Sequence, residues 1–329
     1  MNTNNILFFS GDDLSKILTM DKCIEAMKGA FAALSSGEAI MPLRTGLEME
    51  AENSTALFMP VYLPAISKVG VKSITLARNN PGKGLPLIHA MITVFDAASG
   101  MPLAVMDGEV ITAMRTGAVS GLATALLARS DATCAAIIGT GPQGATQLEA
   151  VCAARDINRA YVFDIQQQRA EAFAAKMAEK LNIEVIPATS PDTLKKADVI
   201  CTATSSNNPV FMDENVKSGA HINGVGSYKP DMAEIDPRTI ARAKVVVDQT
   251  QACLSEAGDI LQPIEQGLIT ADHIHGQLGD IVTGKVVARE NSDEITVFKS
   301  VGVAVQDLIT ADLAIKMAKE LGVGLDIAL

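Results

Sequence analysis

The chain has 329 residues, 48% of them hydrophobic and 20% charged, which allows a large buried core and excludes intrinsic disorder. Its 27 Lys and Arg against 38 Asp and Glu give a net charge of −11, so nucleic acid is not expected as a partner. A chain of this length is expected to form about two domains.

Five cysteines are scattered along the chain without a Cys-x-x-Cys pair, and an odd number cannot all pair within one chain. This usage is typical of reduced thiols. The first residues lack the features of a signal peptide, and no uncharged apolar run approaches the roughly 20 residues that span a bilayer. We therefore expect a cytoplasmic protein with no membrane partner.

The N-terminal part is predicted to combine helices with a mostly antiparallel or mixed sheet. Apolar residues three and four positions apart predict a helix over 20–36. A second helical pattern covers 110–128, with Asp107 ahead of it as a candidate N-cap. Between the two helices, β-rich runs separated by turn clusters predict strands at 56–62, 68–76 and 91–95.

The middle of the chain alternates between strand-like and helix-like runs, which predicts a parallel sheet covered on both faces. Strands are predicted at 134–138, 160–163, 184–186, 199–202, 221–225 and 244–247, and helices at 144–154, 166–181 and 190–196. A last amphipathic helix is predicted from 298 to 321, packing back on the first domain. The predicted fold is therefore α/β: a Rossmann-type doubly wound domain at 131–299, and an α+β domain for substrate binding and dimerisation at 1–130 plus 300–329.

The strongest motif is the glycine-rich turn from Gly139 to Gly144, directly after one predicted strand and directly before a helix. In a dinucleotide-binding turn the first glycine permits the tight turn, the second admits backbone amides to a pyrophosphate, and the third lets helix and strand pack closely. Asp164 follows the second strand, where its carboxylate can bind both ribose hydroxyls and repel a 2′-phosphate. We therefore expect NAD(H) to be preferred over NADP(H).

Three isolated cations stand out in the first part of the chain, each in an apolar setting. Arg44 follows Met-Pro-Leu, Lys72 lies inside the strand-like VGVKSITL, and Arg115 lies in the second helical segment. A cation in mid-strand must reach solvent or a carboxylate partner, because its burial alone costs several kcal/mol.

Taken in order, seven segments resemble the ornithine cyclodeaminase/mu-crystallin family over Met41 to Leu308. They are MPLR, VGVKSIT, LAVMDGEVITAMRTGAVSGLATALLA, IIGTGPQG, HINGVGSYKPDMAEID, SEAGDI and TVFKSVGVAVQDL. The resemblance implies that Arg44, Lys72 and Arg115 surround the α-carboxylate of a substrate, with Lys72 beside the reacting carbon. It also implies homodimers formed through the sheet of the first domain, and a loop around Lys299 and Ser300 that closes near the nicotinamide.

The predicted site therefore has Lys72 as catalytic residue, Arg44, Lys72 and Arg115 as substrate-binding residues, and no metal. The predicted cofactor-binding residues are Arg115, Thr116, Gly139, Thr140, Gly141, Pro142, Gln143, Gly144, Asp164, Ile165, Thr202, Ala203, Thr204, Val225, Gly226, Ser227, Lys299 and Ser300.

One departure from the family pattern bears on the reaction. Ornithine cyclodeaminases carry an Asp in a segment like GGDCPGKTE, whereas Tyr228 stands at that place here. The chain is more similar to the mu-crystallin branch of ketimine reductases, in which members reduce cyclic imines or have alanine dehydrogenase activity.

We therefore expect an NAD(H)-dependent oxidoreductase that transfers hydride between nicotinamide and the α-carbon of an imino or amino acid. The candidate substrates are a cyclic ketimine such as pyrroline-2-carboxylate, or pyruvate plus ammonia to give alanine. The alternatives are an amino-acid cyclodeaminase that releases ammonia with bound NAD, and a non-catalytic nucleotide-binding protein like mu-crystallin.

Other polar residues receive structural interpretations. His273 and His275 are expected in a surface loop, since two ligands fall short of a metal site. Asp307 and Asp312 are expected to be exposed on the last helix. The segment Glu256-Ala257-Gly258-Asp259 resembles a family motif and is expected to act in capping.

Overall fold

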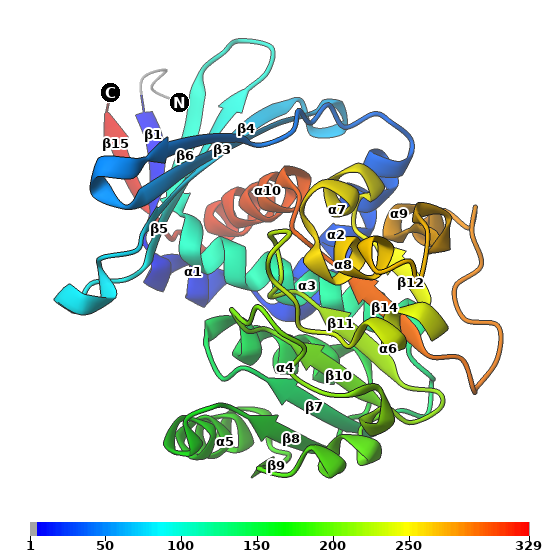
Figure 1. Ribbon diagram of the computed structural model, residues 1–329. Coiled ribbons are helices and arrows are strands. Elements are labelled where there is room, and N and C mark those ends of the chain that lie inside the picture. Colours follow the sequence, from blue (N-terminus) through cyan, green and yellow to red (C-terminus); the bar gives the residue numbers. More distant parts are fainter. Residues whose placement is uncertain (1–4, 329) are drawn as a thin grey trace. The chain divides into compact units, whose positions relative to one another are not determined.

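The computed structural model describes residues 5–328, and the chain divides into two compact units (Figure 1). Unit 1 comprises Met1–Arg115 and Val303–Leu329, and unit 2 comprises Thr116–Gly302. The divisions fall at residues 115 and 302 rather than at the predicted 130 and 299, and the first lies inside a helix. The roles given to the two domains stay predictions.

Unit 1 is built on one mixed sheet, with seven strands among the described residues in the order β15-β1-β6-β5-β4-β3-β2. The strands are β1 (Asn5–Phe9), β2 (Thr45–Met49), β3 (Ser54–Leu63), β4 (Lys68–Ala77), β5 (Ile88–Asp96), β6 (Pro102–Asp107) and β15 (Leu325–Ala328). Only β1 and β6 pair in parallel within this described part, and the other neighbours are antiparallel. The expected antiparallel or mixed sheet is confirmed.

The helices of unit 1 are α1 (Gly11–Ile17), α2 (Met20–Ser35) and α10 (Ala304–Leu321), with the beginning of α3 (Gly108–Leu127). Asp107 caps α3 as predicted, its Oδ1 accepting from the backbone N–H groups of Glu109 and Val110. Short 3₁₀ turns lie at Glu50–Glu52, Pro64–Ile66 and Pro81–Lys83.

The last helix, α10, packs against β3, β4 and α2, which confirms its predicted return to the first domain (Figure 1). A Cβ placed on Gly70 of β4 would lie 2.9 Å from Leu308 Cδ1, so the missing side chain lets the helix approach the strand closely. The helix begins at Ala304 rather than near 298, because residues 296–299 form a strand of the other unit.

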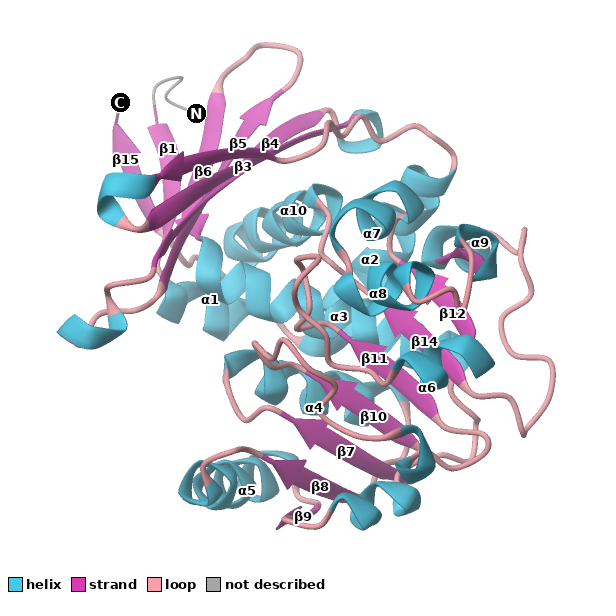
Figure 2. Cartoon of the chain, viewed as in Figure 1, coloured by secondary structure: helices cyan, strands magenta, loops and turns pink. Residues whose placement is uncertain are grey.

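Unit 2 holds a wholly parallel sheet, with eight strands among its described residues in the order β13-β12-β14-β11-β10-β7-β8-β9 (Figure 2). The strands are β7 (Cys134–Ile138), β8 (Arg159–Phe163), β9 (Glu184–Pro187), β10 (Val199–Thr202), β11 (His221–Gly224), β12 (Lys244–Val247), β13 (Ile274–Gln277) and β14 (Thr296–Lys299). The run from β9 to β14 follows the Rossmann order 3-2-1-4-5-6. The predicted fold class is confirmed.

The helices of unit 2 follow the strand–helix alternation. Besides the rest of α3 they are α4 (Pro142–Ala154), α5 (Gln167–Leu181), α6 (Pro237–Arg242), α7 (Thr250–Glu256), α8 (Gly258–Glu265) and α9 (Leu278–Val282). Shorter 3₁₀ segments lie at Pro191–Lys196, Asp213–Asn215 and Ala271–His273, the first at the place of the helix predicted over 190–196. The core under α4 and α5 is apolar and includes Ile137, Leu148 and Val162.

Helix α3 is long and apolar enough to cross a membrane by length and composition, with a mean hydropathy of 1.4. It carries Glu109 and Arg115, and 67% of the apolar window is buried inside the structure. A buried core helix passes the same test, so this feature is weak evidence for a membrane span.

Candidate functional site

The three predicted substrate-binding cations all lie in unit 1. Lys72 occupies the middle of β4, opposite Met59 and Ile92 in the sheet register, and its side chain is turned to the buried face that α10 covers. Only 2% of Lys72 is exposed, and Arg115 is buried as well, whereas Arg44 is half-buried. The apolar neighbours of Lys72 in the sheet cannot solvate an ammonium group.

Asp307, on the first turn of α10, binds two of these cations at once. Its Oδ2 lies 2.7 Å from Lys72 Nζ, and its Oδ1 accepts a hydrogen bond of 3.1 Å from Arg115 Nε. Arg115 Nη1 also donates to Gln306 Oε1 at 2.6 Å. Two cations share one carboxylate in a buried site, which leaves a net positive charge suited to an anionic ligand.

The expectation that Asp307 and Asp312 are exposed is wrong, since they are only 2% and 1% exposed. Asp312 is paired with Lys68, which lies on the same face of β4 as Lys72, and with Lys316 at 2.7 Å. A signal was present in the sequence: lysines at inward positions of a strand need carboxylate partners. The helix predicted to pack on that domain offers two of them.

Burial lowers the pKa of Lys72 to about 8, because water no longer solvates the ammonium group. The carboxylate of Asp307 opposes this shift, while the charges of Arg115 and Arg44 add to it. Since Arg44 acts on Lys72, all three predicted cations form one electrostatic cluster. A lysine with this pKa is mostly protonated at neutral pH and can still release its proton.

The glycine-rich turn of unit 2 has the geometry of a phosphate-binding loop. Gly139, after β7, has a φ of +100°, which favours glycine. A Cβ on Gly144 would lie 2.0 Å from the carbonyl oxygen of Gly139, so turn and helix touch. A Cβ on Gly141 would meet nothing within 4 Å. The turn thus leaves open space beside the first amides of α4, and this space fits a dinucleotide pyrophosphate.

Asp164 follows β8 beside this turn. Its Oδ2 accepts from the backbone N–H and hydroxyl of Thr140, at 3.2 and 2.5 Å, and its Oδ1 accepts from Gln166 N–H. Burial raises the pKa of Asp164, but these hydrogen bonds and the charge of Arg169 outweigh it, and the net pKa is lowered. The next residue, Ile165, is 99% exposed, an apolar surface beside the carboxylate.

Of the other predicted cofactor residues of unit 2, Thr116 lies inside α3, where its carbonyl accepts from Gln147 Nε2. The rest lie at the ends of β10, β11 and β14 or directly after them, at one edge of the sheet. In the register, Thr202 lies beside both Ile138 and Gly224, and Gly224 lies beside Lys299. The carboxyl ends of β7, β10, β11 and β14 therefore align, and the strand order reverses between β7 and β10, where such sheets bind ligands. The structure brings these residues together, and their contact with a cofactor stays a prediction.

The side chains of Lys299, Ser300 and Asp259 are buried and already have partners within unit 2. Lys299 is fully buried, and its Nζ lies 2.9 Å from Asp259 Oδ2. Asp259 Oδ1 accepts from the backbone N–H groups of Glu234 and Ile235, so its carboxylate binds two buried segments rather than capping its own helix. Ser300 donates to Asp248 Oδ2 at 2.7 Å. Sequence reasoning missed Glu234, Asp248 and Asp259 as organisers of this edge.

The two candidate metal-binding histidines bind backbone carbonyls. His273 Nε2 lies 2.8 Å from the oxygen of Ile240, and the exposed His275 has Nε2 2.9 Å from that of Val287. Within residues 5–328, no group of three or more His, Cys, Asp or Glu is arranged to hold a metal ion.

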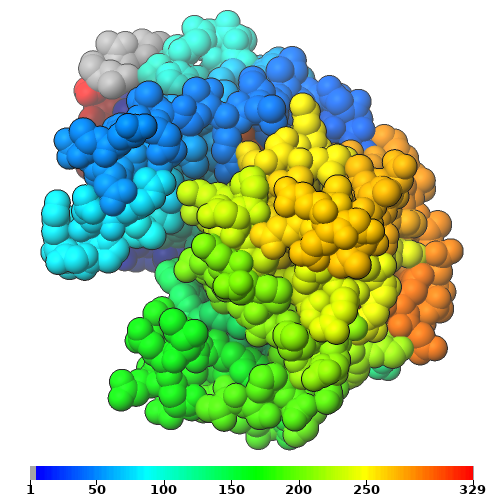
Figure 3. Space-filling view, viewed as in Figure 1, coloured from blue at the N-terminus to red at the C-terminus, as the bar shows by residue number. Residues whose placement is uncertain are grey.

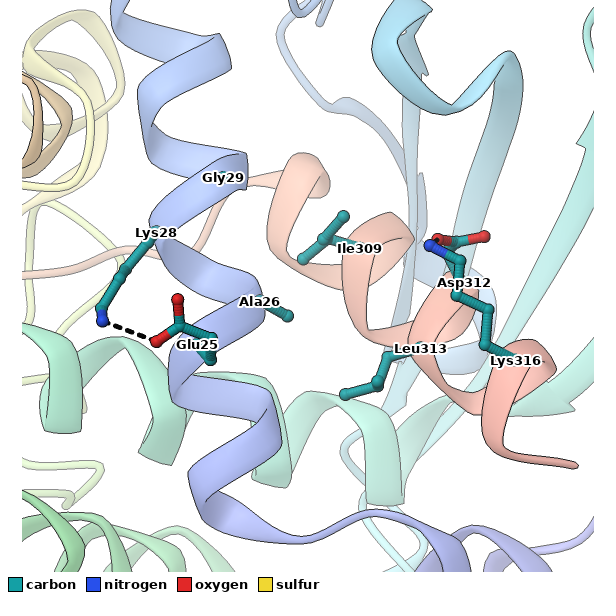
Figure 4. A pocket seen from close by; sticks show the side chains of 8 residues that line it. All are labelled: Glu25, Ala26, Lys28, Gly29, Ile309, Asp312, Leu313 and Lys316. Atoms are coloured by element: carbon teal, nitrogen blue, oxygen red, sulfur yellow. Dashed lines mark hydrogen bonds and ion pairs between the residues drawn. The ribbon is translucent and has the colours of Figure 1, made fainter. Parts of the chain in front are cut away.

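A groove of about 370 Å³ lies between α2 and α10 of unit 1 (Figure 4). Glu25 and Lys28 form an ion pair on its α2 side, and Asp312 and Lys316 lie on its α10 side. None of the predicted site residues lines it.

A sequence profile of the ornithine cyclodeaminase/mu-crystallin family matches residues 7–320. The chain is 39% identical to a Delta(1)-pyrroline-2-carboxylate reductase of Bacillus cereus, over 97% of this chain and 98% of that protein. The solved Thermococcus litoralis Delta(1)-pyrroline-2-carboxylate reductase, in complex with NADH and L-proline, has a TM-score of 0.94 and 44% identity, covering 98% of this chain and 100% of that one.

A third similar protein is an archaeal alanine dehydrogenase, solved as a dimer with bound NAD. It has a TM-score of 0.92 and 31% identity, and the match covers 99% of each chain. Both solved neighbours carry the fold over essentially their full length. The chain belongs to the ornithine cyclodeaminase/mu-crystallin family.

Proposed function

We propose that the chain is an NAD(H)-dependent imine reductase whose substrate is a cyclic α-imino acid such as Δ1-pyrroline-2-carboxylate. The chain is an oxidoreductase that acts on imino or amino acids, like the pyrroline-2-carboxylate reductases and the alanine dehydrogenase that it resembles. The observation that carries the proposal is the buried cluster in which Lys72 and Arg115 share Asp307. That cluster offers a positive site for a carboxylate and a lysine with a lowered pKa.

In the proposed reaction, the guanidinium groups of Arg44 and Arg115 bind the substrate carboxylate by charge-assisted hydrogen bonds and orient the imine. When bound, NADH supplies a hydride to the imine carbon. Lys72 donates the proton that the imine nitrogen needs, from Nζ, and is then protonated again from solvent. Asp307 keeps Nζ in place and keeps its pKa from falling further.

The glycine-rich turn and Asp164 of unit 2 have a geometry that fits NADH. The open turn at Gly141 and the first amides of α4 would bind the pyrophosphate, and Asp164 would accept hydrogen bonds from the adenosine ribose. Because Asp164 has a lowered pKa and stays ionised, it would repel a 2′-phosphate. This supports the proposed preference for NAD(H) over NADP(H).

A homodimer is part of the proposal. The face of the unit 1 sheet opposite α10 exposes Phe58 and Met91, which lie on either side of Ser73 in the register. The strands β2 to β5 (blue to cyan) lie at the surface in Figure 3. Exposed apolar surface of this kind is typical of an interface, and the archaeal alanine dehydrogenase was solved as a dimer.

Alanine formation from pyruvate and ammonia is a second candidate, favoured by the likeness to the archaeal alanine dehydrogenase. Cyclodeamination is less favoured, because Tyr228 replaces the aspartate that the cyclodeaminase pattern carries. The Tyr228 ring contacts the Lys229 ammonium at 5.9 Å from its centroid and offers no carboxylate to a distal amine.

The test is to follow NADH absorbance with purified protein and Δ1-pyrroline-2-carboxylate, Δ1-piperideine-2-carboxylate, or pyruvate plus ammonia, and ammonia release from ornithine. We expect NADH consumption to be fastest with a cyclic imine. Ammonia release from ornithine without net NADH change would instead establish a cyclodeaminase, and no turnover at all would support a binding protein.

The variant Lys72→Ala tests the proton donor. Its kcat/KM should fall by roughly 10²-fold or more, because a positioned acid typically contributes that much. Lys68→Ala is the matched control, since Lys68 lies on the same face of the same strand and pairs with Asp312 instead. Equal activity in both variants would remove Lys72 from the mechanism.

A further inference from the structure

Glu234 is fully buried and lies outside every predicted binding set, yet its carboxylate joins two loops of unit 2. Oε1 accepts from Thr204 N–H at 2.6 Å, in the loop that follows β10. Oε2 accepts from Gly226 and Ser227 N–H at 2.7 and 3.2 Å, in the loop that follows β11. Thr202 Oγ1 donates to the same oxygen at 3.0 Å.

The three backbone donors lie just past the ends of β10 and β11, where they have no partner in the sheet, so another acceptor must satisfy them. The fit also depends on Gly226: a Cβ there would lie 2.2 Å from the carbonyl oxygen of Thr204 and 2.5 Å from Glu234 Oε1. A side chain would therefore separate the loops and the carboxylate. Neither loop can move away without breaking charge-assisted hydrogen bonds in a buried site.

The backbone of Glu234 is itself fixed by a second buried carboxylate. Asp259 Oδ1 accepts from the N–H groups of Glu234 and Ile235, and Asp259 Oδ2 pairs with Lys299 at the end of β14. One connected group of buried charges therefore links the carboxyl ends of three neighbouring strands, β10, β11 and β14.

We propose that Glu234 is the positioning residue of the two loops that follow β10 and β11, held in place by Asp259 and Lys299. This inference rests on the proposed function, since Thr202, Thr204, Gly226 and Ser227 are predicted to bind the cofactor. Glu234 touches no substrate or cofactor in this role. It fixes the backbone that does, and so sets the affinity for NADH rather than the chemistry.

The opposite end of the same sheet provides a matched control. Asp198 Oδ2 accepts from the backbone N–H groups of Thr133 and Cys134, both at 3.0 Å, and the carboxylate pairs with Lys217. It too joins segments next to neighbouring strands, but at their amino ends. Removal of either carboxylate should lower the stability of the protein, whereas only removal of the Glu234 carboxylate is expected to weaken NADH binding.

The experiment compares Glu234→Gln and Asp198→Asn in the full-length protein, by fluorescence titration with NADH and by hydrogen exchange. Gln brings an NH₂ group against backbone donors, so the Kd for NADH should rise roughly tenfold or more. Exchange should accelerate in peptides around Thr204 and Gly226. Asp198→Asn should keep the wild-type Kd. If Glu234→Gln does not fold, Glu234→Asp, which retracts the carboxylate by one methylene, takes its place.

The inference would be overturned if the Glu234 variant kept the Kd for NADH and the hydrogen-exchange rates of the wild type. It would also be overturned if the Glu234 and Asp198 variants lost NADH affinity equally. If the wild-type protein binds NADH but reduces no imino acid, the proposed function fails while the role of Glu234 is still decided by Kd and exchange. No NADH binding by the wild-type protein would overturn both.

Discussion

The burial of Lys72 lowers the stability of the folded protein, but it also lowers the pKa of this side chain. An ammonium buried to 2% exposure loses its hydration, and the adjacent carboxylate of Asp307 restores only part of that free energy. The result is a lysine with a pKa of about 8 instead of 10.5. The same burial that weakens the charged form makes the proton available near physiological pH.

Asp307→Asn should move the pH profile of the enzyme. Because the charge and hydrogen bond of Asp307 raise the pKa of Lys72, their removal lowers it below about 8. The protonated lysine is then lost at lower pH, so the basic limb of kcat/KM against pH should shift to lower pH. Asp312→Asn, five residues along the same helix, should leave that limb in place. An unshifted limb in Asp307→Asn would exclude Lys72 as the titrating acid.

Asp164→Ser should change the choice of cofactor. Loss of the charged acceptor removes charge-assisted hydrogen bonds to the ribose, so kcat/KM with NADH should fall roughly tenfold or more. The value of kcat/KM with NADPH should rise, because the carboxylate no longer repels the 2′-phosphate. The measurement is the ratio of the two kcat/KM values. Asp192→Ser, an exposed carboxylate of the same unit paired with Lys195, serves as control. An unchanged ratio would show that Asp164 does not face the ribose.

At the level of elements, the junction between β7 and α4 depends on glycines for two different reasons. Gly144 lies against the carbonyl of Gly139, so its role is packing, whereas Gly141 faces open space, so its role is access. The two roles cannot be distinguished from the Gly-x-Gly-x-x-Gly spacing alone. They follow from what a Cβ would meet at each position.

The variants Gly144→Ala and Gly141→Ala should therefore behave differently. In Gly144→Ala the added methyl group pushes α4 away from the turn, which should lower the Tm by about 4 °C or more. Gly141→Ala should keep the wild-type Tm but weaken NADH binding, because its methyl group occupies the space predicted for the pyrophosphate. Thermal unfolding without cofactor and NADH titration give the two readouts. A stable Gly144→Ala, or full NADH affinity in Gly141→Ala, would contradict this division of roles.

At the scale of the whole molecule, the sheet of unit 1 has two contrasting faces. The face toward α10 carries buried Lys72 between apolar neighbours, and the other face exposes Phe58 and Met91. The alternation of a strand assigns successive residues to opposite faces. One strand, β4, thus carries a buried cation on one face while its other face belongs to the proposed interface.

The double variant Phe58→Glu with Met91→Glu should be monomeric at concentrations where the wild type is a dimer. Charges placed in an apolar interface lose their hydration on association. Light scattering coupled to size-exclusion chromatography measures the mass. Val287→Glu, at an exposed apolar position of unit 2, controls for added charge. A dimeric double variant would place the interface elsewhere.

Elements with a strong hydrophobic period and motifs with a fixed spacing could be predicted from the amino-acid sequence alone. The helix at 20–36 and the strands around Lys72 follow from the hydrophobic period, and the glycine-rich turn follows from its position between strand and helix. The boundary before the last helix is wrong: the sequence predicts this helix from residue 298, whereas β14 ends at Lys299 and α10 begins at Ala304. The apolar residues of β14 run on into those of α10, so the hydrophobic pattern does not mark the change from strand to helix.

The pairing of the buried charges could not be predicted, because it depends on how distant segments pack in three dimensions. Asp307 is distant from Lys72 and Arg115 in the sequence, and on its own helix it looks like a solvated carboxylate until α10 lies against β4. Glu234 gains its four donors in the same way, from the last residue of β10 and from the loops that follow β10 and β11. The hydrophobic period of a segment indicates whether that segment forms a helix or a strand. The pairing of buried charges depends instead on which distant segments pack together, and no fixed spacing in the sequence indicates this packing.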